Sequence, residues 1–256
     1  MLLVNVFVEF DPWGRMGNRM FQYAFAHILA KKRNTRLYTN GLPNFNIPNN
    51  IGRAIPVNPL YTRSLGNNFI NFSELNTTPR DIVVNSFVQK SEYYIPYRDE
   101  LRHVFGIRPH TVQDDKLVVH VRETDYVQIN QFLGYDYYRK LIDYSGFKDV
   151  VIVTDNSECE TVKKLLKDGC KLNTEGTVKD FNITNDARAM NDFDTLLQSD
   201  NIAISQSSFS WWAAFLGNHT NIIFPFKENG GQWLLEPGPD DSDLYFESPA
   251  SVKFVL

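Results

Sequence analysis

Short runs of β-branched residues alternate with amphipathic segments along the second half of the chain, and this alternation constrains the fold more than any other feature. The runs lie at residues 117–121, 150–154, 201–204 and 221–224. Val and Ile favour β-strands, and the segments between the runs carry apolar side chains at helical spacing. Strands that alternate with helices in this way predict a parallel, doubly wound α/β sheet.

The same pattern predicts a helix over residues 192–199 with Asp192 and Asp194 in its first turn, and a last strand that stops at Pro225. An Asp-x-Asp pair holds a metal-bound nucleotide in some transferases, but there it follows an apolar strand. The pair at Asp192 begins a helix and the pair at Asp241 follows a Pro-Gly segment. No metal ion or other cofactor is therefore expected.

Polar side chains stand where three of the strands should end. His120 and Arg122 close the first run, Asp155 follows the second, and the third leads into the serine-rich segment 205–210. Because the carboxyl ends of parallel strands share one edge of a sheet, these groups are expected to converge on one ligand. The planar fork of an arginine and the free N–H groups at a helix start both suit a diphosphate. An aspartate at a strand end commonly accepts hydrogen bonds from a ribose or a base.

Each of these groups also has a purely structural interpretation. Arg122 could end its strand in a solvated charge cluster, Ser208 could cap a helix, and Asp155 could cap the helix after it. Trp211 and Trp212 are expected to pack in the core. The convergence of three strand ends favours the ligand site.

The first half of the chain begins with an apolar run at residues 1–9, a loop with Gly14 and Gly17, and a long helical segment. Two glycines let backbone N–H groups approach a ligand at a helix N-terminus. Arg15 and Asn18 add side-chain donors there. The alternative is that the glycines serve only the conformation of a tight turn. We place a domain boundary in the polar stretch before the strand at 117, which gives an N-terminal domain, 1–112, and a C-terminal domain, 113–256.

The formal net charge of −4 argues against a nucleic-acid-binding protein. The two cysteines, Cys159 and Cys170, have no metal or redox spacing. The first apolar run is too short for a membrane span and lacks the features of a signal peptide. We therefore expect a cytoplasmic protein with no transmembrane segment and at most peripheral membrane association.

Four spaced motifs resemble glycosyltransferase family 11, the α-1,2-fucosyltransferase group, which is distantly similar to the protein O-fucosyltransferases. Residues 14–26 are similar to the family's G-G-x-G-N-Q-x-F-Q-Y-A signature, and residues 120–126 resemble its H-x-R-R-x-D-Y motif. Residues 153–156 and 205–212 complete the set in the family's order. Because four motifs match in order, the resemblance is specific.

The resemblance implies a GT-B architecture of two Rossmann-like domains that face a cleft, with GDP-fucose held mainly by the C-terminal domain. It implies inverting, metal-independent transfer of L-fucose from GDP-β-L-fucose to a galactose-terminated glycan, usually in α-1,2 linkage. In that picture Arg122 pairs with the β-phosphate, His120 flanks it, and Asp155 holds the base or the ribose. Phosphates and nucleoside are lined by Gln206, Ser207, Ser208 and Phe209. From the N-terminal domain, the residues that close over fucose and phosphate are Arg15, Met16, Gly17 and Asn18.

Two positions depart from the family pattern or leave a role open. Glu123 stands where the family has a second arginine, and this could weaken donor binding. Since neighbours on a strand face opposite sides, we expect Glu123 to point away from His120 and Arg122. Asp125 is the nearest candidate for a catalytic base, although orienting Arg122 is its more natural role. The alternatives are a GDP-sugar- or glycan-binding protein without turnover, or a transferase for another GDP-sugar or acceptor.

Overall fold

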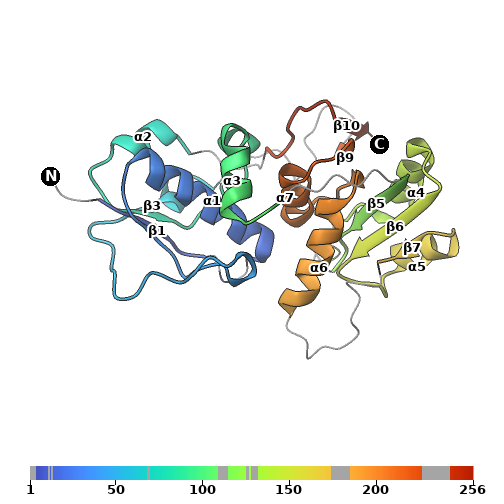
Figure 1. Ribbon diagram of the computed structural model, residues 1–256, viewed down its shortest axis with the longest axis horizontal. Coiled ribbons are helices and arrows are strands. Elements are labelled where there is room, and N and C mark those ends of the chain that lie inside the picture. Colours follow the sequence, from blue (N-terminus) through green and yellow to red (C-terminus); the bar gives the residue numbers. More distant parts are fainter. Residues whose placement is uncertain are drawn as a thin grey trace. The chain divides into compact units, whose positions relative to one another are not determined.

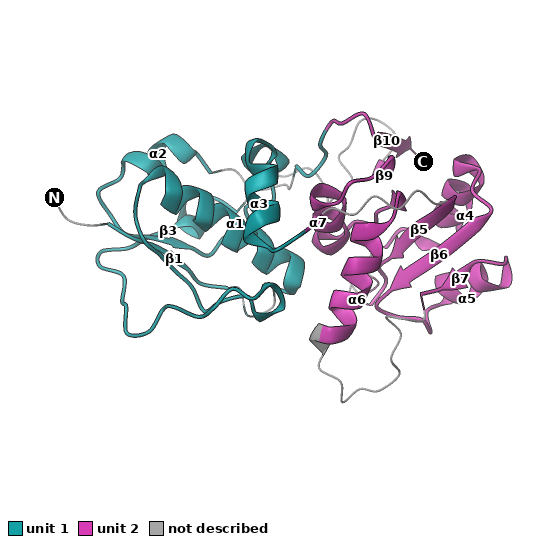
Figure 2. Cartoon of the chain, in the orientation of Figure 1, with its two compact units in different colours: residues 1–107, 236–246 teal, residues 108–235, 247–256 magenta. Residues whose placement is uncertain are grey.

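The computed structural model describes residues 4–10, 12, 14–67, 70–108, 115–124, 127, 132–173, 185–226 and 243–255, without the side chains of residues 185 and 186. The chain divides into two compact units (Figures 1 and 2). Unit 1 comprises Met1–Ile107 and Glu236–Phe246, and unit 2 comprises Arg108–Leu235 and Glu247–Leu256. The predicted boundary between residues 112 and 113 falls outside the described residues and stays a prediction.

Unit 1 is built on a four-stranded parallel sheet with the strand order β2-β1-β4-β3. Its strands are β1 (Val6–Val8), β2 (Leu37–Tyr38), β3 (Leu60–Tyr61) and β4 (Ile82–Val84). Its α-helices are α1 (Met16–Lys32), α2 (Phe72–Thr77) and α3 (Arg98–Val104). Short 3₁₀ turns lie at Pro43–Phe45, Thr62–Ser64, Ser91–Tyr93 and Ile95–Tyr97.

Helix α1 is the main cover of the unit 1 sheet, because one of its faces is almost wholly apolar. Its buried residues include Phe21, Phe25 and Ile28, and Lys31 and Lys32 stand in its last turn, where cations suit the helix dipole. The ring of Phe25 lies 4.4 Å from that of Phe72 in α2. This packing holds the middle of α1 against α2.

Unit 2 is built on a six-stranded parallel sheet with the order β10-β9-β8-β5-β6-β7. Its strands are β5 (Lys116–Val121), β6 (Asp149–Thr154), β7 (Lys171–Leu172), β8 (Asn201–Ala203), β9 (Asn221–Phe226) and β10 (Ser251–Val255). Its helices are α4 (Gly134–Ser145), α5 (Glu160–Lys167), α6 (Asn185–Gln198) and α7 (Ser208–Leu216). The predicted parallel α/β class is confirmed.

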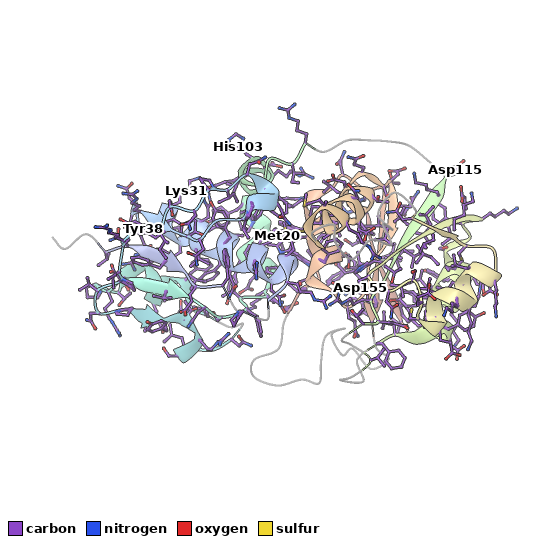
Figure 3. All side chains as sticks on the ribbon, turned by 90° about the horizontal axis from the view of Figure 1, so that it is seen from below. Met20, Lys31, Tyr38, His103, Asp115 and Asp155 are labelled. Atoms are coloured by element: carbon purple, nitrogen blue, oxygen red, sulfur yellow. The ribbon has the colours of Figure 1, made fainter. Side chains whose placement is uncertain are left out.

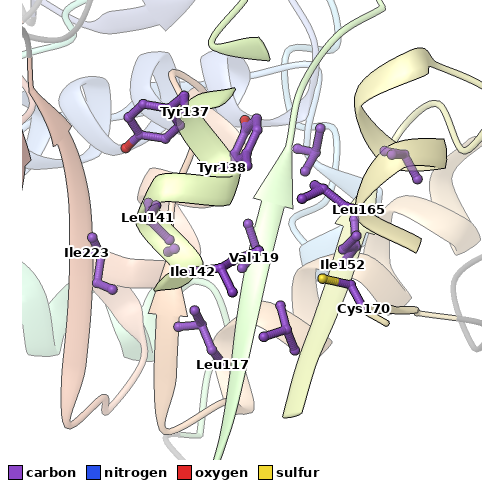
Figure 4. Close-up of a cluster of buried hydrophobic side chains, with 14 of the residues drawn as sticks. Leu117, Val119, Tyr137, Tyr138, Leu141, Ile142, Ile152, Leu165, Cys170 and Ile223 are labelled. Atoms are coloured by element: carbon purple, nitrogen blue, oxygen red, sulfur yellow. The ribbon is translucent and has the colours of Figure 1, made fainter. Parts of the chain in front are cut away.

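The central strand β5 is buried on both faces, which explains its continuous apolar run. Leu117, Val119 and Val121 pack with Leu141 of α4 and Leu165 of α5 (Figure 4). His120, on the opposite face, contacts Ser205 and Phe209 at the start of α7. Because side chains alternate along a strand, β5 turns only apolar residues to one helix layer, and the buried Val118 together with His120 to the other.

Two sequence expectations about unit 2 are wrong. Helix α6 begins at Asn185, so Asp192 and Asp194 lie past its middle and not in its first turn. Strand β9 continues through Pro225 to Phe226. The nitrogen of Pro225 points away from β10, since that of Ile222 points toward it, and β8 has already ended at Ala203. The missing N–H coincides with the end of the β8–β9 ladder, whose last bond runs from the Ile204 N–H to the Ile223 carbonyl.

Strand β10 had no signal in the sequence, because it is a short, half-exposed edge strand. Trp211 and Trp212 are fully buried, as expected from the sequence. Within the described part of the chain, no helix combines the length and the apolar content that a membrane crossing requires.

We expect Leu141→Ala to lower the free energy of unfolding by about 2–5 kcal/mol, because it leaves a cavity beside β5. Urea denaturation followed by circular dichroism measures this change. The same substitution at Leu65, which is 41% exposed, is the control and should change stability by no more than about 0.5 kcal/mol. Equal effects of the two substitutions would contradict the assigned core.

Candidate active site

The polar groups of unit 2 lie where the order of its strands reverses. From β5 the chain runs outward through β6 to β7, and it then returns to place β8 on the other side of β5. The segments that follow β5 and β8 therefore leave the sheet in opposite directions. Ligands of open α/β sheets bind at this switch point, outside the carboxyl ends of the strands.

Arg122 lies just beyond β5 and is held by the end of the neighbouring strand β6. Its Nη1 donates to Oδ2 of Asp155, which follows β6 directly (Figure 3), and the Thr124 hydroxyl donates to the same oxygen. The Arg122 side chain is only 12% exposed and that of Asp155 24%. Asp155, predicted to bind the nucleoside, therefore orients the guanidinium in this structure.

His120 is a neutral member of this group. Its ring is buried, with Nδ1 2.7 Å from the Ser205 hydroxyl and its centroid 5.6 Å from that of Phe209. Burial lowers the pKa of His120 to about 3, although the charge of Asp155 opposes the shift; the charge of Arg122 adds to it. At neutral pH the imidazole therefore offers hydrogen bonds to a ligand without adding charge.

The segment after β8 supplies the start of helix α7. Ser205, Gln206 and Ser207 are buried, and the Ser207 hydroxyl accepts from the Phe209 N–H, which makes Ser207 the N-cap in place of Ser208. The first turn of α7, all of it described, contains no acidic residue. The dipole of α7 therefore gives this end of the helix a positive potential that suits an anion. The Phe209 ring meets that of Phe193 edge to face at 5.5 Å.

Glu123 points away from this site. It is 5% exposed, and its charge contributes, after burial, to raising the pKa of Cys159 to about 11. It also raises the pKa of Tyr138 in α4, where burial is again the main cause. The carboxylate therefore lies on the α4–α5 side of the sheet, as strand alternation predicts. It does not compete with a diphosphate beside Arg122.

Asp192 is a buried carboxylate near this site that the sequence analysis did not select. It is 8% exposed, and the Asn173 carboxamide donates to its Oδ1 at 3.1 Å. Burial raises the pKa of Asp192 to about 6; Asn173 and Arg188 oppose the shift, and the nearby charge of Asp155 adds to it. The sequence did contain a signal for it. Asp192 directly precedes the apolar Phe193, so it lies next to the buried face of the helix.

The remaining predicted site residues lie in unit 1 or outside the described residues. Arg15 is exposed at the N-cap of α1, and Gly17 and Asn18 are in its first turn. Met16 begins that helix, and its sulfur is 3.5 Å from the Asn44 carboxamide nitrogen. Asp125 lies outside the described residues.

The described part of the chain contains no group of three or more His, Cys, Asp or Glu side chains placed to bind a metal ion.

Comparison with known proteins links this geometry to one family. The model of glycosyl transferase family 11 matches residues 84–232, more than half of the chain. The crystal structure of the NodZ α-1,6-fucosyltransferase with GDP is similar over 86% of this chain and 94% of that chain, with a TM-score of 0.51 and 14% identity. The selenomethionine structure of fucosyltransferase NodZ from Bradyrhizobium has the same coverage and TM-score at 13% identity. At this identity the likeness concerns the fold, a two-sheet GT-B architecture. No curated protein sequence matches the chain.

We expect Asp192→Asn to raise the free energy of unfolding by up to about 3 kcal/mol at pH 7. The folded-state pKa lies near 6, above the ordinary 3.8, so the native state is penalised for holding the charge once the pH exceeds both values. The gain should therefore shrink toward zero as the pH falls from 6 to 4. Denaturation of variant and wild type at each pH measures the difference.

Asp99→Asn is the control for this substitution, since the Asp99 side chain is 92% exposed. It should change the free energy of unfolding by no more than about 0.5 kcal/mol at each pH measured. A pH-independent effect of Asp192→Asn would contradict the raised pKa.

Proposed function

The chain belongs to glycosyl transferase family 11, and on this premise we propose that it transfers L-fucose from GDP-β-L-fucose to a galactose hydroxyl of a glycan in α-1,2 linkage. The observation that carries the proposal is the guanidinium of Arg122, held by Asp155 at the switch point of unit 2 beside the start of α7. The fold likeness to NodZ, a fucosyltransferase crystallised with GDP, supports the choice of donor.

The reaction needs a group that takes up negative charge. The galactose hydroxyl oxygen attacks the anomeric carbon of fucose from the face opposite GDP, and the bond from that carbon to the β-phosphate oxygen breaks. GDP leaves with the electron pair, the hydroxyl loses its proton, and the configuration inverts from β to α. Because the transition state resembles an oxocarbenium ion, stabilising the departing diphosphate lowers the barrier most.

Arg122 and the start of α7 fit this role. A guanidinium carries five N–H donors in a fixed plane, so one edge can hold Asp155 while another meets a phosphate. The ion pair also fixes the direction of that plane before the ligand arrives, which avoids reorganisation during the reaction. The N–H groups at the start of α7 add a second source of positive potential.

Neutral polar groups complete the proposed donor site. Ser207 and Ser208 stand at the start of α7, and Gln206 precedes them, as the family resemblance requires of residues beside the nucleotide. His120 supplies hydrogen bonds without charge, and the Phe209 ring offers an apolar wall. Asp125 stays the predicted candidate for the base that receives the acceptor proton, or for a second group that orients Arg122.

A panel of donors and acceptors tests the proposed reaction. GDP-fucose, GDP-mannose and UDP-galactose are each incubated with lactose, Galβ1-3GalNAc and N-acetyllactosamine, with and without EDTA. We expect GDP release only from GDP-fucose with a galactoside, unchanged by EDTA, and an α-1,2 linkage in the product by NMR. GDP binding without release from any pair would support a non-catalytic binding protein, and transfer to another hydroxyl would correct the linkage.

Arg122→Ala should lower kcat by about 10²–10³, the usual cost of losing one preorganised charge-stabilising group. Arg122→Lys keeps the charge but loses the planar fork, so its kcat should fall between those of Arg122→Ala and the wild type. GDP release from GDP-fucose with lactose provides the rates, and thermal melting shows that each variant folds.

The matched control is Arg139→Ala, which removes a surface arginine paired with Asp143 one helical turn away. It should leave kcat unchanged. Near-normal turnover of folded Arg122→Ala would refute the role given to this residue.

A further inference from the structure

In unit 1 the carboxyl ends of the neighbouring strands β1 and β4 lie side by side. From β1 the chain passes through α1 to β2 on one side, and β4 pairs with β1 on the other side. The segment before α1 and the segment at residues 85–91 therefore leave the sheet at adjacent strand ends. Ligands of open α/β sheets bind outside the carboxyl ends of the strands, where these two segments lie.

Val88, in the segment after β4, has a backbone conformation that β-branched residues avoid. Its φ is +49°, in the left-handed region. Four hydrogen bonds hold it there: its N–H donates to the Asn67 carbonyl at 2.9 Å, and its carbonyl accepts from the Tyr94 hydroxyl at 2.6 Å and from the Lys90 N–H at 3.0 Å. On its N-terminal side, the Phe87 N–H donates to the Asn67 carboxamide. Strain that is held in place by many contacts is typical of functional sites.

The strained turn presents Gln89, the next residue, to the start of helix α1. The Gln89 carboxamide nitrogen donates to Oδ1 of Asn18 at 2.8 Å, across 71 positions of sequence. The carbonyl of Gln89 accepts from the Asp243 N–H at 2.9 Å, so its backbone is held from a third segment of unit 1. Both carboxamides are half-buried, which leaves them within reach of a ligand.

This hydrogen bond sets the orientation of the Asn18 carboxamide toward a ligand. A carboxamide has one acceptor oxygen and one NH₂ group with two donors. Gln89 occupies one lone pair of the Asn18 oxygen and fixes the plane of the carboxamide, so the NH₂ group, whose two hydrogens can serve more than one acceptor, has a set direction in which to donate to a ligand. The matching group on a sugar nucleotide or a glycan is an oxygen that accepts: a phosphate, a hydroxyl or a ring oxygen.

We infer that Gln89 is a positioning residue, which sets the carboxamide of Asn18 so that Asn18 donates a hydrogen bond to an oxygen of a substrate. The inference rests on the proposed fucosyl transfer, and it adds a residue of unit 1 that no sequence motif had selected. Gln89 acts through Asn18, and the strained turn at Val88 supplies the rigidity that this positioning requires.

Two substitutions separate the hydrogen bond from simple packing. Gln89→Met keeps the length and volume of the side chain but removes the donor, whereas Gln89→Ala removes both. Asn18→Ala and the double variant Asn18→Ala/Gln89→Ala complete a mutant cycle. Gln198→Ala is the matched control, because Gln198 is an exposed glutamine at the end of α6, away from the described site groups.

The measurements are kcat and KM for GDP-fucose and for lactose, and the affinities for GDP and GDP-fucose by calorimetry. We expect Gln89→Met and Gln89→Ala to lower kcat/KM alike, by about tenfold, the effect of one hydrogen bond. The double variant should be no worse than Asn18→Ala alone, because Gln89 has no role once Asn18 is gone. Gln198→Ala should match the wild type.

The affinities and the KM for lactose identify which substrate oxygen accepts the hydrogen bond from Asn18. Weaker binding of GDP itself indicates a phosphate, weaker binding of GDP-fucose alone indicates the fucose, and a higher KM for lactose indicates the acceptor. If Gln89→Met behaves like the wild type in every measurement, or the Asn18 and Gln89 losses multiply, the inference is overturned. A wild type that binds GDP-fucose without releasing GDP overturns the proposed transfer instead, and the calorimetric comparison of Gln89→Met with wild type still decides the role of Gln89.

Discussion

Each unit is a parallel sheet, and the shared direction of its strands decides where a ligand can sit. In unit 2 the strand order also reverses, between β5 and β8, and in unit 1 the ends of β1 and β4 are neighbours. Since every strand in a sheet runs the same way, all strand ends and helix starts meet at one rim, and only at the reversal do the connections diverge. The polar side chains Arg122 and Asn18 each stand at such a rim.

The ion pair of Arg122 with Asp155 shows how a charged site is kept inside an apolar scaffold. A guanidinium that is 12% exposed would be costly without a partner. Asp155 reduces that cost and fixes the direction of the fork, while the neighbouring His120 stays uncharged because of its burial. The carboxylate of Glu123 lies on the α4–α5 side of the sheet, away from Arg122. The proposed donor site thus combines one oriented cation with neutral hydrogen-bonding groups, a combination suited to a leaving diphosphate.

The features that could be predicted from the sequence are those that depend on near neighbours in the chain. The strand at residues 116–121 and the helix after Ser207 follow from local apolar runs and from a capping serine. Asp192 was placed in a first turn because the residues of α6 before it include few large apolar side chains, and β10 was missed because an edge strand has little apolar signal. Pro225 was taken as a strand end, although only the ladder with β8 stops there and β9 continues beside β10.

The sequence by itself determined the α/β class, the family, and the convergence of His120, Arg122 and Asp155, because period and order are local properties of a chain that folds into parallel strands. Only the tertiary structure decided which groups contact each other. That Asp155 holds Arg122, and that Gln89 holds Asn18 from 71 positions away, depends on strand order and on a strained turn. Contacts of this kind join residues distant in sequence, and a single sequence carries no local signal for them.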